Sequence, residues 1–396
     1  MKPSIGVAVI GAGMAGRAHA QGYRSAQSVY SLAPYDVRLV AVTDLDEALA
    51  TDAARRYGYE RAETAWQAIA EAPDIEAVSV VVANPVHREV VTGLLEAGKH
   101  VLCEKPLAPD TADAAAMVAA ADRASSIARV GYTFRFTPGV RAIAELVQSG
   151  SLGKPLHFAG QYWTDYGCDP LAPLTWRYKG GLGSGVLADI GSHIVDAGEF
   201  VCGSVLSVGG ANLSTHVTRR PLPLGRVTGH DHGAVSGETG AVENEDDANY
   251  SVRFAGGATG SIGISRMAYG HPNTLHFEVF CERGAAVYDA RTPAEILLAD
   301  ERSAGADNGF RRVLLGPSHA LVGQGLPFDG AGIGFGHNDA FVFQARSFLD
   351  EIAGIRELPG CPSLAHGLHN LEIQEAVVDA AATGARINLD AEAVLS

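Results

Sequence analysis

Three glycines near the start of the chain constrain its fold more than any other feature. In "VAVIGAGMAGRAHA", Gly11, Gly13 and Gly16 show GxGxxG spacing directly after a strand-like run and at the start of a helix-like one. The first glycine allows a tight turn, the second lets the backbone approach a pyrophosphate, and the third permits close helix–strand packing. The helix start, with Met14 and Ala15, would offer free amides to the phosphates. We predict that this segment binds a dinucleotide.

The first 130 residues alternate short apolar runs with amphipathic stretches. The runs are nearly continuous in apolar residues, which is typical of a parallel sheet covered on both faces. Gly58 and Gly98 end two of the helical stretches and would cap them. Strands are predicted at 5–10, 38–43, 77–82, 100–103 and 127–132, and helices at 46–58, 87–98 and 111–124. The pattern predicts an α/β fold that begins with a doubly wound Rossmann domain over residues 1–132.

Beyond about residue 150 the strand-like runs become longer and glycine turns join them. This predicts a C-terminal α+β domain over residues 133–396, with an open, mostly antiparallel or mixed sheet. The stretch 219–245, rich in glycine, histidine and acids, is expected to be a long loop.

An acid follows the second predicted strand in "RLVAVTDLD". Asp44 stands where a carboxylate would accept hydrogen bonds from the adenosine ribose hydroxyls. It lies 28 residues past Gly16, against a usual separation of about 20, and the extra stretch "SAQSVYSLAPYD" accounts for the excess. A carboxylate there repels a 2′-phosphate and no arginine follows at once, so NAD is favoured over NADP. The alternative is that Asp44 only caps the helix near Glu47, although Asp46 could do so instead.

A second cluster lies in "GSGVLADIGSHIVDAGEF". Asp189, His193 and Asp196 fall at i, i+4 and i+7, which places them on one face of a helix. An adjoining apolar stripe would face a core. Histidine is the natural general base near neutral pH, and a carboxylate one turn away can orient it. A surface histidine–acid pair is the alternative.

Together with "AGKHVLCEKPLA", these segments resemble the Gfo/Idh/MocA (glucose–fructose oxidoreductase/inositol dehydrogenase) family. The resemblance extends to "WRYKGG", "NEDDANYSVRFAGGATGSIGISR" and "GLHNLEIQEAVVDAA", and so spans almost the whole chain. It implies an NAD-dependent dehydrogenase acting on CH–OH groups, with one face of the second domain's sheet often packed against another subunit. We therefore expect a homodimer or homotetramer formed through the C-terminal sheet.

The resemblance also implies roles for three residues. His193 would take the hydroxyl proton as hydride leaves for NAD. Lys105 of the EKP motif would polarise the reacting oxygen, and Asp189 would hold His193 or a neighbouring sugar hydroxyl. In "VLCEKPLAP", Lys105 ends a parallel strand, where open α/β sheets bind ligands. Glu104 would line the nicotinamide side, and a cis Lys105–Pro106 bond is expected.

Further contacts are expected around this centre. Asn84, Pro85 and His87 would lie on the nicotinamide side, although "VVANPVHREVV" is shorter than the family pattern and Asn84 replaces a threonine. Thr133 stands where the family often has asparagine. Aromatic and polar side chains suit a sugar ring, although the same residues could be core aromatics and surface charges. The expected substrate contacts, besides Lys105, Asp189 and His193, are Tyr132, Arg135, Trp163, Asp165, Trp176 and Arg177.

Composition excludes other classes of protein. The net charge of −15 is spread along the chain, which disfavours nucleic acid or an anionic membrane as a partner. The start mimics a signal peptide, but its glycines have the better explanation above. Five scattered cysteines indicate reduced thiols in a cytoplasm. "GHDHG" at 229–233 and the pair His366/His369 do not make a metal site, and no metal is expected.

The sequence therefore predicts hydride transfer from a secondary hydroxyl of a sugar, glycoside or inositol to NAD, with Lys105, Asp189 and His193 as the catalytic set. One alternative is a carbonyl or imine reductase of the same fold that uses NADPH. The other is a non-catalytic sensor that binds a dinucleotide to regulate a partner. The first alternative would show in the cofactor preference, and the second in tight NAD binding without turnover.

Overall fold

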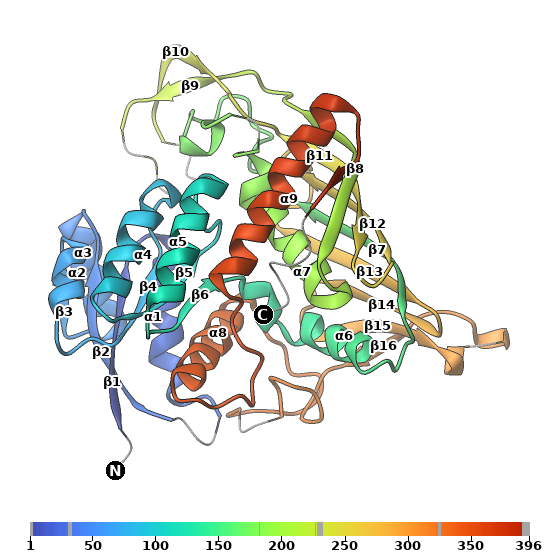
Figure 1. Ribbon diagram of the computed structural model, residues 1–396, viewed down its shortest axis with the longest axis horizontal. Coiled ribbons are helices and arrows are strands. Elements are labelled where there is room, and N and C mark those ends of the chain that lie inside the picture. Colours follow the sequence, from blue (N-terminus) through green and yellow to red (C-terminus); the bar gives the residue numbers. More distant parts are fainter. Residues whose placement is uncertain are drawn as a thin grey trace. The chain divides into compact units, whose positions relative to one another are not determined.

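The computed structural model describes residues 3–30, 34–181, 183–225, 227, 233–303, 305–323 and 326–389 (Figure 1). Contacts divide the chain into two compact units, each described here by itself. The first unit comprises Met1–Pro138 and Leu315–Leu368, and the second comprises Gly139–Leu314 and His369–Ser396. The late segment 315–368 thus groups with the N-terminal residues. The single boundary after residue 132 remains a prediction.

The first unit contains a six-stranded sheet whose strands pair in parallel. Its order is β3-β2-β1-β4-β5-β6, so the direction of winding reverses between β1 and β4. The strands are β1 (Ser4–Ile10), β2 (Asp36–Thr43), β3 (Arg61–Glu63), β4 (Ala77–Val80), β5 (His100–Glu104) and β6 (Ala128–Gly131). The predicted doubly wound sheet is confirmed, and only the short edge strand β3 was not predicted. Open sheets of this kind bind ligands at the carboxyl edge, next to the reversal.

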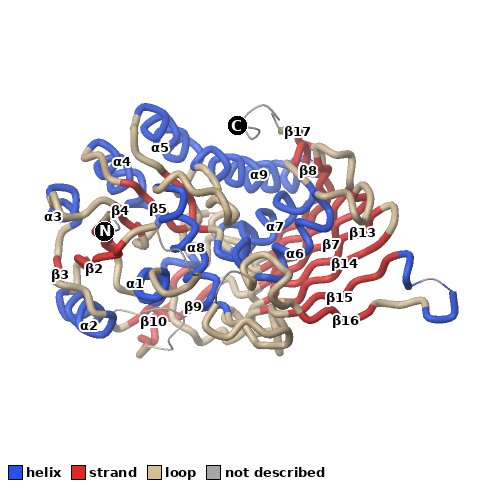
Figure 2. Tube along the Cα trace, turned by 90° about the horizontal axis from the view of Figure 1, so that it is seen from below, coloured by secondary structure: helices blue, strands red, loops and turns tan. Residues whose placement is uncertain are grey.

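Helices cover both faces of this sheet. They are α1 (Met14–Ala26), α2 (Glu47–Tyr57), α3 (Trp66–Glu71), α4 (His87–Glu96), α5 (Thr111–Arg123) and α8 (His337–Ile352). Helix α1 contacts α2 and α8, whereas α4 contacts α5 on the other side of the sheet (Figure 2). Gly22 lets α8 approach α1 closely, because a Cβ there would lie 2.8 Å from the Phe341 carbonyl oxygen. Gly58 caps α2 at φ 78°, as predicted.

The second unit is built on a nine-stranded mixed sheet. Its order is β16-β15-β14-β13-β7-β12-β11-β8-β17. In the described residues its neighbours are antiparallel except β7 and β12, which run parallel. The strands are β7 (Pro155–Trp163), β8 (Val205–Ser214), β11 (Asp247–Phe254), β12 (Thr259–Ser265), β13 (Thr274–Cys281), β14 (Gly284–Asp289), β15 (Glu295–Asp300), β16 (Arg311–Leu314) and β17 (Ile387–Asn388). The predicted mixed sheet is confirmed.

One face of this sheet carries helices α6 (Pro138–Gln148), α7 (Ser192–Cys202) and the later part of α9 (Leu364–Thr383) (Figure 2). Strand residues alternate between the two faces. Phe158, Tyr162 and Phe277 point to the helix-covered face and are buried. Glycines allow the close approach of α7, since a Cβ on Gly160 would lie 2.9 Å from the Ile194 side chain.

The prediction of a loop at 219–245 is wrong for much of that stretch. Strands β9 (Arg219–Pro223) and β10 (Val235–Ala241) form an antiparallel hairpin. Arg220 anchors it, because its buried guanidinium donates to the carbonyls of Gly167 and Asp169, at 2.6 Å each. Long-range partners of this kind leave no trace in local composition. No helix in the described part of the chain has the length and apolar character needed to cross a bilayer.

Candidate active site

The three glycines after β1 have different surroundings. Gly11 adopts φ 107°, and a Cβ there would lie 2.2 Å from the Val81 carbonyl oxygen. A Cβ on Gly16 would lie 1.8 Å from the Gly11 carbonyl oxygen. A Cβ on Gly13 would meet nothing within 4 Å. Gly11 and Gly16 therefore allow the turn and the close packing, whereas Gly13 faces open space into which a pyrophosphate fits.

The first turn of α1 offers its amides to an anion. The helix begins at Met14, which is exposed, and Ala15 follows. No acidic residue lies in this turn, and no described side chain caps it. The N–H groups of such a turn and the helix dipole both favour a bound phosphate. The loop and the helix start therefore fit a dinucleotide.

The Asp44 carboxylate lies at the end of β2 beside this loop. It accepts hydrogen bonds from the backbone N–H groups of Ala12 and Asp46, at 2.9 Å each. Asp46, not Asp44, caps α2, since its side chain accepts from the N–H groups of Ala48 and Leu49. The capping alternative for Asp44 is therefore wrong. The two backbone donors hold the carboxylate at the carboxyl edge of the sheet, where it fits a ribose with free 2′ and 3′ hydroxyls.

Lys105 follows β5 directly, at the same edge of the sheet. It is half-buried, whereas Glu104 before it is buried. The Lys105 N–H donates to Glu104 Oε2 at 3.1 Å. The Lys105–Pro106 peptide bond is cis, as predicted. The carboxylate of Glu104 thus folds back onto the peptide that leads into the lysine.

Sequence reasoning missed His19, whose imidazole is buried in the first unit. Its Nε2 lies 2.9 Å from Glu104 Oε1, and its Nδ1 lies 3.0 Å from Ser79 Oγ. The available signal was its position on the buried face of α1, three residues after Gly16. A histidine on that otherwise small and apolar face needs polar partners.

The turn after β4 holds three expected cofactor contacts. Asn84 and Pro85 lie in a short 3₁₀ turn (Asn84–Val86), partly exposed and exposed respectively. His87 is buried, with Nδ1 3.1 Å from the Leu107 carbonyl oxygen and Nε2 3.0 Å from that of Val82. Burial lowers the pKa of His87, and the two carbonyls oppose this shift. His87 thus ties this turn to the segment after Lys105, while the cofactor contacts of the turn stay predictions.

Tyr132 and Arg135 form a cluster with His366 after β6. Arg135 Nη2 lies 2.8 Å from His366 Nε2, and the rings of Tyr132 and His366 meet edge to face at 5.7 Å. Because a guanidinium only donates, the Nε2 of His366 acts as the acceptor. Tyr132 is buried, and Arg135 is partly exposed. The substrate contacts predicted for these two residues stay predictions.

In the second unit, Asp189 lies in a π-helical turn (Leu187–Gly191) that runs into α7. The prediction of one regular helix through Asp189 and His193 is therefore wrong in detail. Glu245 holds the wide turn, because its carboxylate accepts from the N–H groups of Gly183 at 2.9 Å and Leu187 at 3.0 Å. Single π-helical turns occur often at functional sites, since they re-aim a side chain.

Two side chains from other loops converge on Asp189. Tyr166 donates its hydroxyl to Asp189 Oδ2 at 2.9 Å, and Arg177 Nε lies 3.8 Å from the same oxygen. Burial first, and then the charge of Asp189, raise the pKa of Tyr166, which keeps it a donor. The Arg177 guanidinium also stacks on the exposed ring of Trp176, at 4.4 Å from its centroid. A carboxylate, a cation and an aromatic face thus lie together, while the substrate contacts predicted for these residues stay predictions.

His193 lies on α7 with its side chain largely buried. Its ring centroid is 6.1 Å from that of Tyr162 on β7, so it faces the helix-covered side of the sheet. Asp196 is buried at 1% exposure. The adjoining stripe of Ile190, Ile194, Ala197 and Val201 is buried, as predicted.

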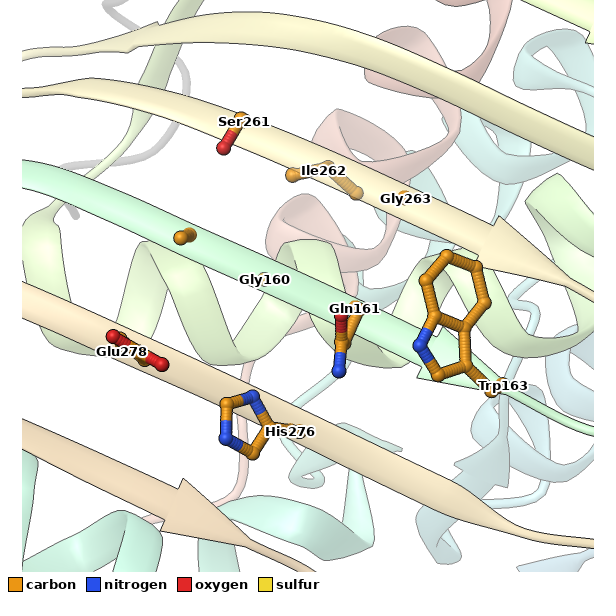
Figure 3. A pocket seen from close by; sticks show the side chains of 9 residues that line it. Gly160, Gln161, Trp163, Ser261, Ile262, Gly263, His276 and Glu278 are labelled. Carbon is orange, nitrogen blue, oxygen red and sulfur yellow. The ribbon is translucent and has the colours of Figure 1, made fainter. Parts of the chain in front are cut away.

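Trp163 points away from His193. It alternates with Tyr162 along β7, and it lines a shallow hollow of about 320 Å³ on the open face of the sheet (Figure 3). The structure therefore does not bring Trp163 to Asp189 and His193 within one chain. Asp165 follows β7 in a turn, where its carbonyl accepts from the Cys168 N–H at 3.0 Å.

The described residues contain no group of three or more side chains arranged to hold a metal ion. His366 contacts Arg135, and His369 lies 3.0 Å from Glu199. The central residues of the "GHDHG" stretch, 230–232, lie outside the described residues.

Two family models match the chain. One, described as an oxidoreductase family with an NAD-binding Rossmann fold, matches residues 5–132. The other, described as the GFO/IDH/MocA C-terminal domain, matches residues 140–287. The matches cover the glycine loop, Lys105, Asp189 and His193.

Curated and solved relatives extend this similarity over the whole chain. Levoglucosan dehydrogenase of Pseudarthrobacter phenanthrenivorans is 34% identical over 388 residues, which is 96% of each chain. Myo-inositol 2-dehydrogenase of Thermotoga maritima is 28% identical over 308 residues, which is 77% of this chain and 80% of the relative. A structure of levoglucosan dehydrogenase with NADH and L-sorbose superposes with a TM-score of 0.89 at 32% identity, covering 98% of this chain and 99% of the other.

Proposed function

This chain belongs to the Gfo/Idh/MocA family of NAD-binding oxidoreductases, and from that premise we propose which of its residues carry the reaction. The protein is an NAD-dependent dehydrogenase that transfers hydride from a secondary hydroxyl of a sugar, glycoside or inositol to NAD. The observation that carries this function is the gathering of three features at one edge of the parallel sheet. The open space at Gly13, the carboxylate of Asp44 and the half-buried Lys105 all lie at its carboxyl ends.

The roles proposed for the protein's own residues follow from their chemistry. Bound NAD supplies the acceptor for the hydride that leaves the carbinol carbon. His193 takes the hydroxyl proton, because imidazole is the usual general base near neutral pH. The Lys105 ammonium donates to the reacting oxygen and stabilises its alkoxide character. Asp189, supported by Tyr166 and Arg177, holds a hydroxyl of the substrate or orients His193.

We propose that the substrate is a small cyclic sugar or a derivative of one, with levoglucosan the first compound to test. The relative named for that compound covers 96% of this chain. The exposed Trp176 ring, with Arg177 stacked on it, would meet the apolar face of a sugar. A panel of anhydrosugars, sugars and inositols with NAD, followed at the absorbance of reduced nicotinamide, identifies the class.

The catalytic roles predict the behaviour of two variants. Lys105→Ala and His193→Ala should each lower kcat by about 10²–10⁴-fold while the Kd for NAD changes little. Both are measured at saturating NAD, with NAD binding followed by fluorescence. Lys154→Ala, which removes an exposed lysine, serves as the control. Full activity of both catalytic variants would contradict the mechanism.

The cofactor preference tests the role of Asp44. Asp44→Ser should weaken NAD binding and narrow the preference for NAD over NADP by about 10-fold or more, because the repulsion of a 2′-phosphate is lost. Titrating the wild type and Asp44→Ser with NAD and with NADP measures the Kd of each cofactor and hence the change in preference. A wild-type preference for NADPH would instead favour the reductase alternative. Tight NAD binding without turnover on any compound would favour the sensor.

We further propose that the protein is a homodimer or homotetramer formed through the open face of the nine-stranded sheet. Small residues such as Ser261 and Gly263 line part of that face, beside the larger Trp163 and His276 (Figure 3). Phe280 and Leu297 add partly exposed apolar surface, at 37% and 38% exposure. Where the side chains of such a face are short, a second sheet can approach closely.

We also propose a cytoplasmic location, because the cysteines of this chain form no disulfide bonds. All five cysteines are unpaired and buried, as is usual where thiols stay reduced. Fractionation of the source cells tests it, and recovery outside the cytoplasmic fraction would overturn it.

A further inference from the structure

A buried chain of hydrogen bonds connects α1 with the peptide that carries Lys105. His19 and Tyr23 lie on α1, Ser79 lies on β4, and Glu104 ends β5. Tyr23 and Ser79 lie 3.0 Å apart through their hydroxyl oxygens, and Ser79 meets His19 Nδ1 at 3.0 Å. His19 Nε2 reaches Glu104 Oε1 at 2.9 Å, and Glu104 Oε2 accepts from the Lys105 N–H at 3.1 Å.

The directions of these bonds follow from what each group can donate. An ionised carboxylate only accepts, so His19 Nε2 carries the proton that points to Glu104. In a neutral ring Nδ1 then accepts from the Ser79 hydroxyl, and the Ser79 oxygen accepts from Tyr23. Burial raises the pKa of Tyr23, which keeps its hydroxyl protonated and able to donate. The links from Tyr23 through Ser79 and His19 thus all point toward Glu104, and the Lys105 N–H donates to the same carboxylate from the other side.

The surroundings hold the Glu104 carboxylate in place. A Cβ on Gly131, at the end of β6, would lie 2.9 Å from Glu104 Oε1, so glycine there leaves the room that the carboxylate occupies. The ring of Phe341 meets His19 edge to face at 5.3 Å. His337, on the same helix as Phe341, keeps an exposed surface but lies near Glu104 and Lys105. Desolvation lowers the pKa of His337, the charge of Glu104 raises it, and the charge of Lys105 lowers it.

We propose that His19 is a positioning residue for the dehydrogenase: through the Glu104 carboxylate it fixes the peptide from which Lys105 extends. The inference rests on the proposed function of Lys105 and deepens it. Because His19 lies on α1, whose first turn offers its amides to the pyrophosphate, the same helix sets both the cofactor and the lysine. His19 touches neither the cofactor nor the substrate in this role.

Loss of the hydrogen bond between His19 and Glu104 should lower the reaction rate, because the Glu104 carboxylate is buried. Without His19 the Glu104 carboxylate, which is 8% exposed, loses its imidazole donor. A buried carboxylate with too few donors turns toward water or a new partner, and it then releases the Lys105 N–H. Misplacement of a catalytic group by about 1 Å is enough to cost about 100-fold in rate. The loss should therefore appear in kcat rather than in the affinity for NAD.

Two substitutions of His19 test the contributions of its two ring nitrogens separately. The amide nitrogen of His19→Gln can occupy the place of Nε2 and still donate to Glu104. The shorter His19→Asn can occupy only the place of Nδ1 and meets Ser79 alone. His100→Asn serves as the control. His100 lies at the other end of β5, where its Nδ1 accepts from the Ile127 N–H at 3.0 Å.

The kinetic experiment compares kcat, KM and the Kd for NAD in the wild type and these variants, with Lys105→Ala alongside. His19→Asn should lose about 10- to 100-fold in kcat with the Kd for NAD nearly unchanged. His19→Gln should recover kcat to within about threefold of the wild type, and the control should stay within about twofold. Equal kcat in the Asn and Gln variants, whether high or low, would overturn the proposal. Full activity of Lys105→Ala overturns the proposed mechanism instead.

Crystal structures of the wild type and His19→Asn with NAD give a readout that needs no turnover. We expect the Glu104 carboxylate and the Lys105 side chain to move in His19→Asn while the glycine loop stays in place. Unchanged positions of both residues would overturn the positioning role, even if no substrate is found for the wild type.

Discussion

At the scale of single residues, the three loop glycines are distinguished by what a side chain would meet. A Cβ on Gly16 would overlap the Gly11 carbonyl oxygen, at 1.8 Å, whereas a Cβ on Gly13 would meet only open space. Gly13 also has φ −68°, which alanine adopts without strain. The two positions therefore separate the stability of the fold from the affinity for the cofactor.

We predict opposite outcomes for Gly13→Ala and Gly16→Ala. Gly16→Ala should destabilise the protein by about 1–3 kcal/mol or more, as overpacking does. Gly13→Ala should leave the melting temperature nearly unchanged but weaken NAD binding by about 10-fold or more, because the added methyl group occupies space that the pyrophosphate needs. Thermal unfolding and NAD titration of both variants measure this. A stable Gly13→Ala protein with unchanged NAD affinity would show that the dinucleotide binds elsewhere.

These roles could be predicted from sequence because the glycines, strand and helix are neighbours along the chain. The same holds for Asp44 and Lys105, each of which directly follows a predicted strand. His19 could not be predicted, because its partner Glu104 lies 85 positions away and meets it only once β5 lies beside β4. The convergence of Tyr166 and Arg177 on Asp189 also depends on long-range folding.

At the scale of elements, a buried ion pair joins α9 to α7, the helix that carries His193. His369 Nε2 lies 3.0 Å from Glu199 Oε1, and both side chains are almost fully buried. Asn370 adds a hydrogen bond from its side chain to the Ser192 carbonyl, at 3.1 Å. Regular periodicity predicted the helix around His193, but not its ion pair with α9 or the π-helical turn before α7, because these depend on side chains from other elements.

The ion pair predicts how stability depends on pH. Burial lowers the pKa of His369, but Glu199 and then Glu372 outweigh it, and the net pKa is raised above 6.5. When the pKa of a group is higher in the folded state than in the unfolded state, its protonation stabilises the fold at any pH below the unfolded-state pKa. This stabilisation is lost as the pH rises through the folded-state pKa. The stability advantage of the wild type over His369→Gln should therefore shrink across the range of pH above 6.5. Urea unfolding of both proteins at a series of pH values measures it. A constant difference across that range would mean that His369 is not protonated in the fold.

At the scale of the whole molecule, the open face of the nine-stranded sheet is the surface through which we propose that two copies of the chain pack. Helices α6, α7 and α9 cover only the other face (Figure 2). On the open face, His276 and Glu278 from β13 stand beside Gln161 and Trp163 from β7 (Figure 3). Antiparallel sheets can leave one face to water, but this one carries Trp163 beside the hollow and the exposed side chains of Phe280 and Leu297. A second copy of the same face would cover these side chains.

A single charge at the centre of that face should separate the subunits. Ser261 lies on β12 with its side chain exposed toward the open face. Ser261→Arg places a long, charged side chain where two sheets would meet, and burying an unpaired charge costs several kcal/mol. We expect the variant to remain folded, with a cooperative thermal transition, but to elute from a size-exclusion column at the mass of one chain. Light scattering after size exclusion measures this, with Ser151→Arg, in the exposed turn before β7, as the matched control. If both variants keep the wild-type oligomer, the subunits associate through a different surface, and the open sheet face is left to another role.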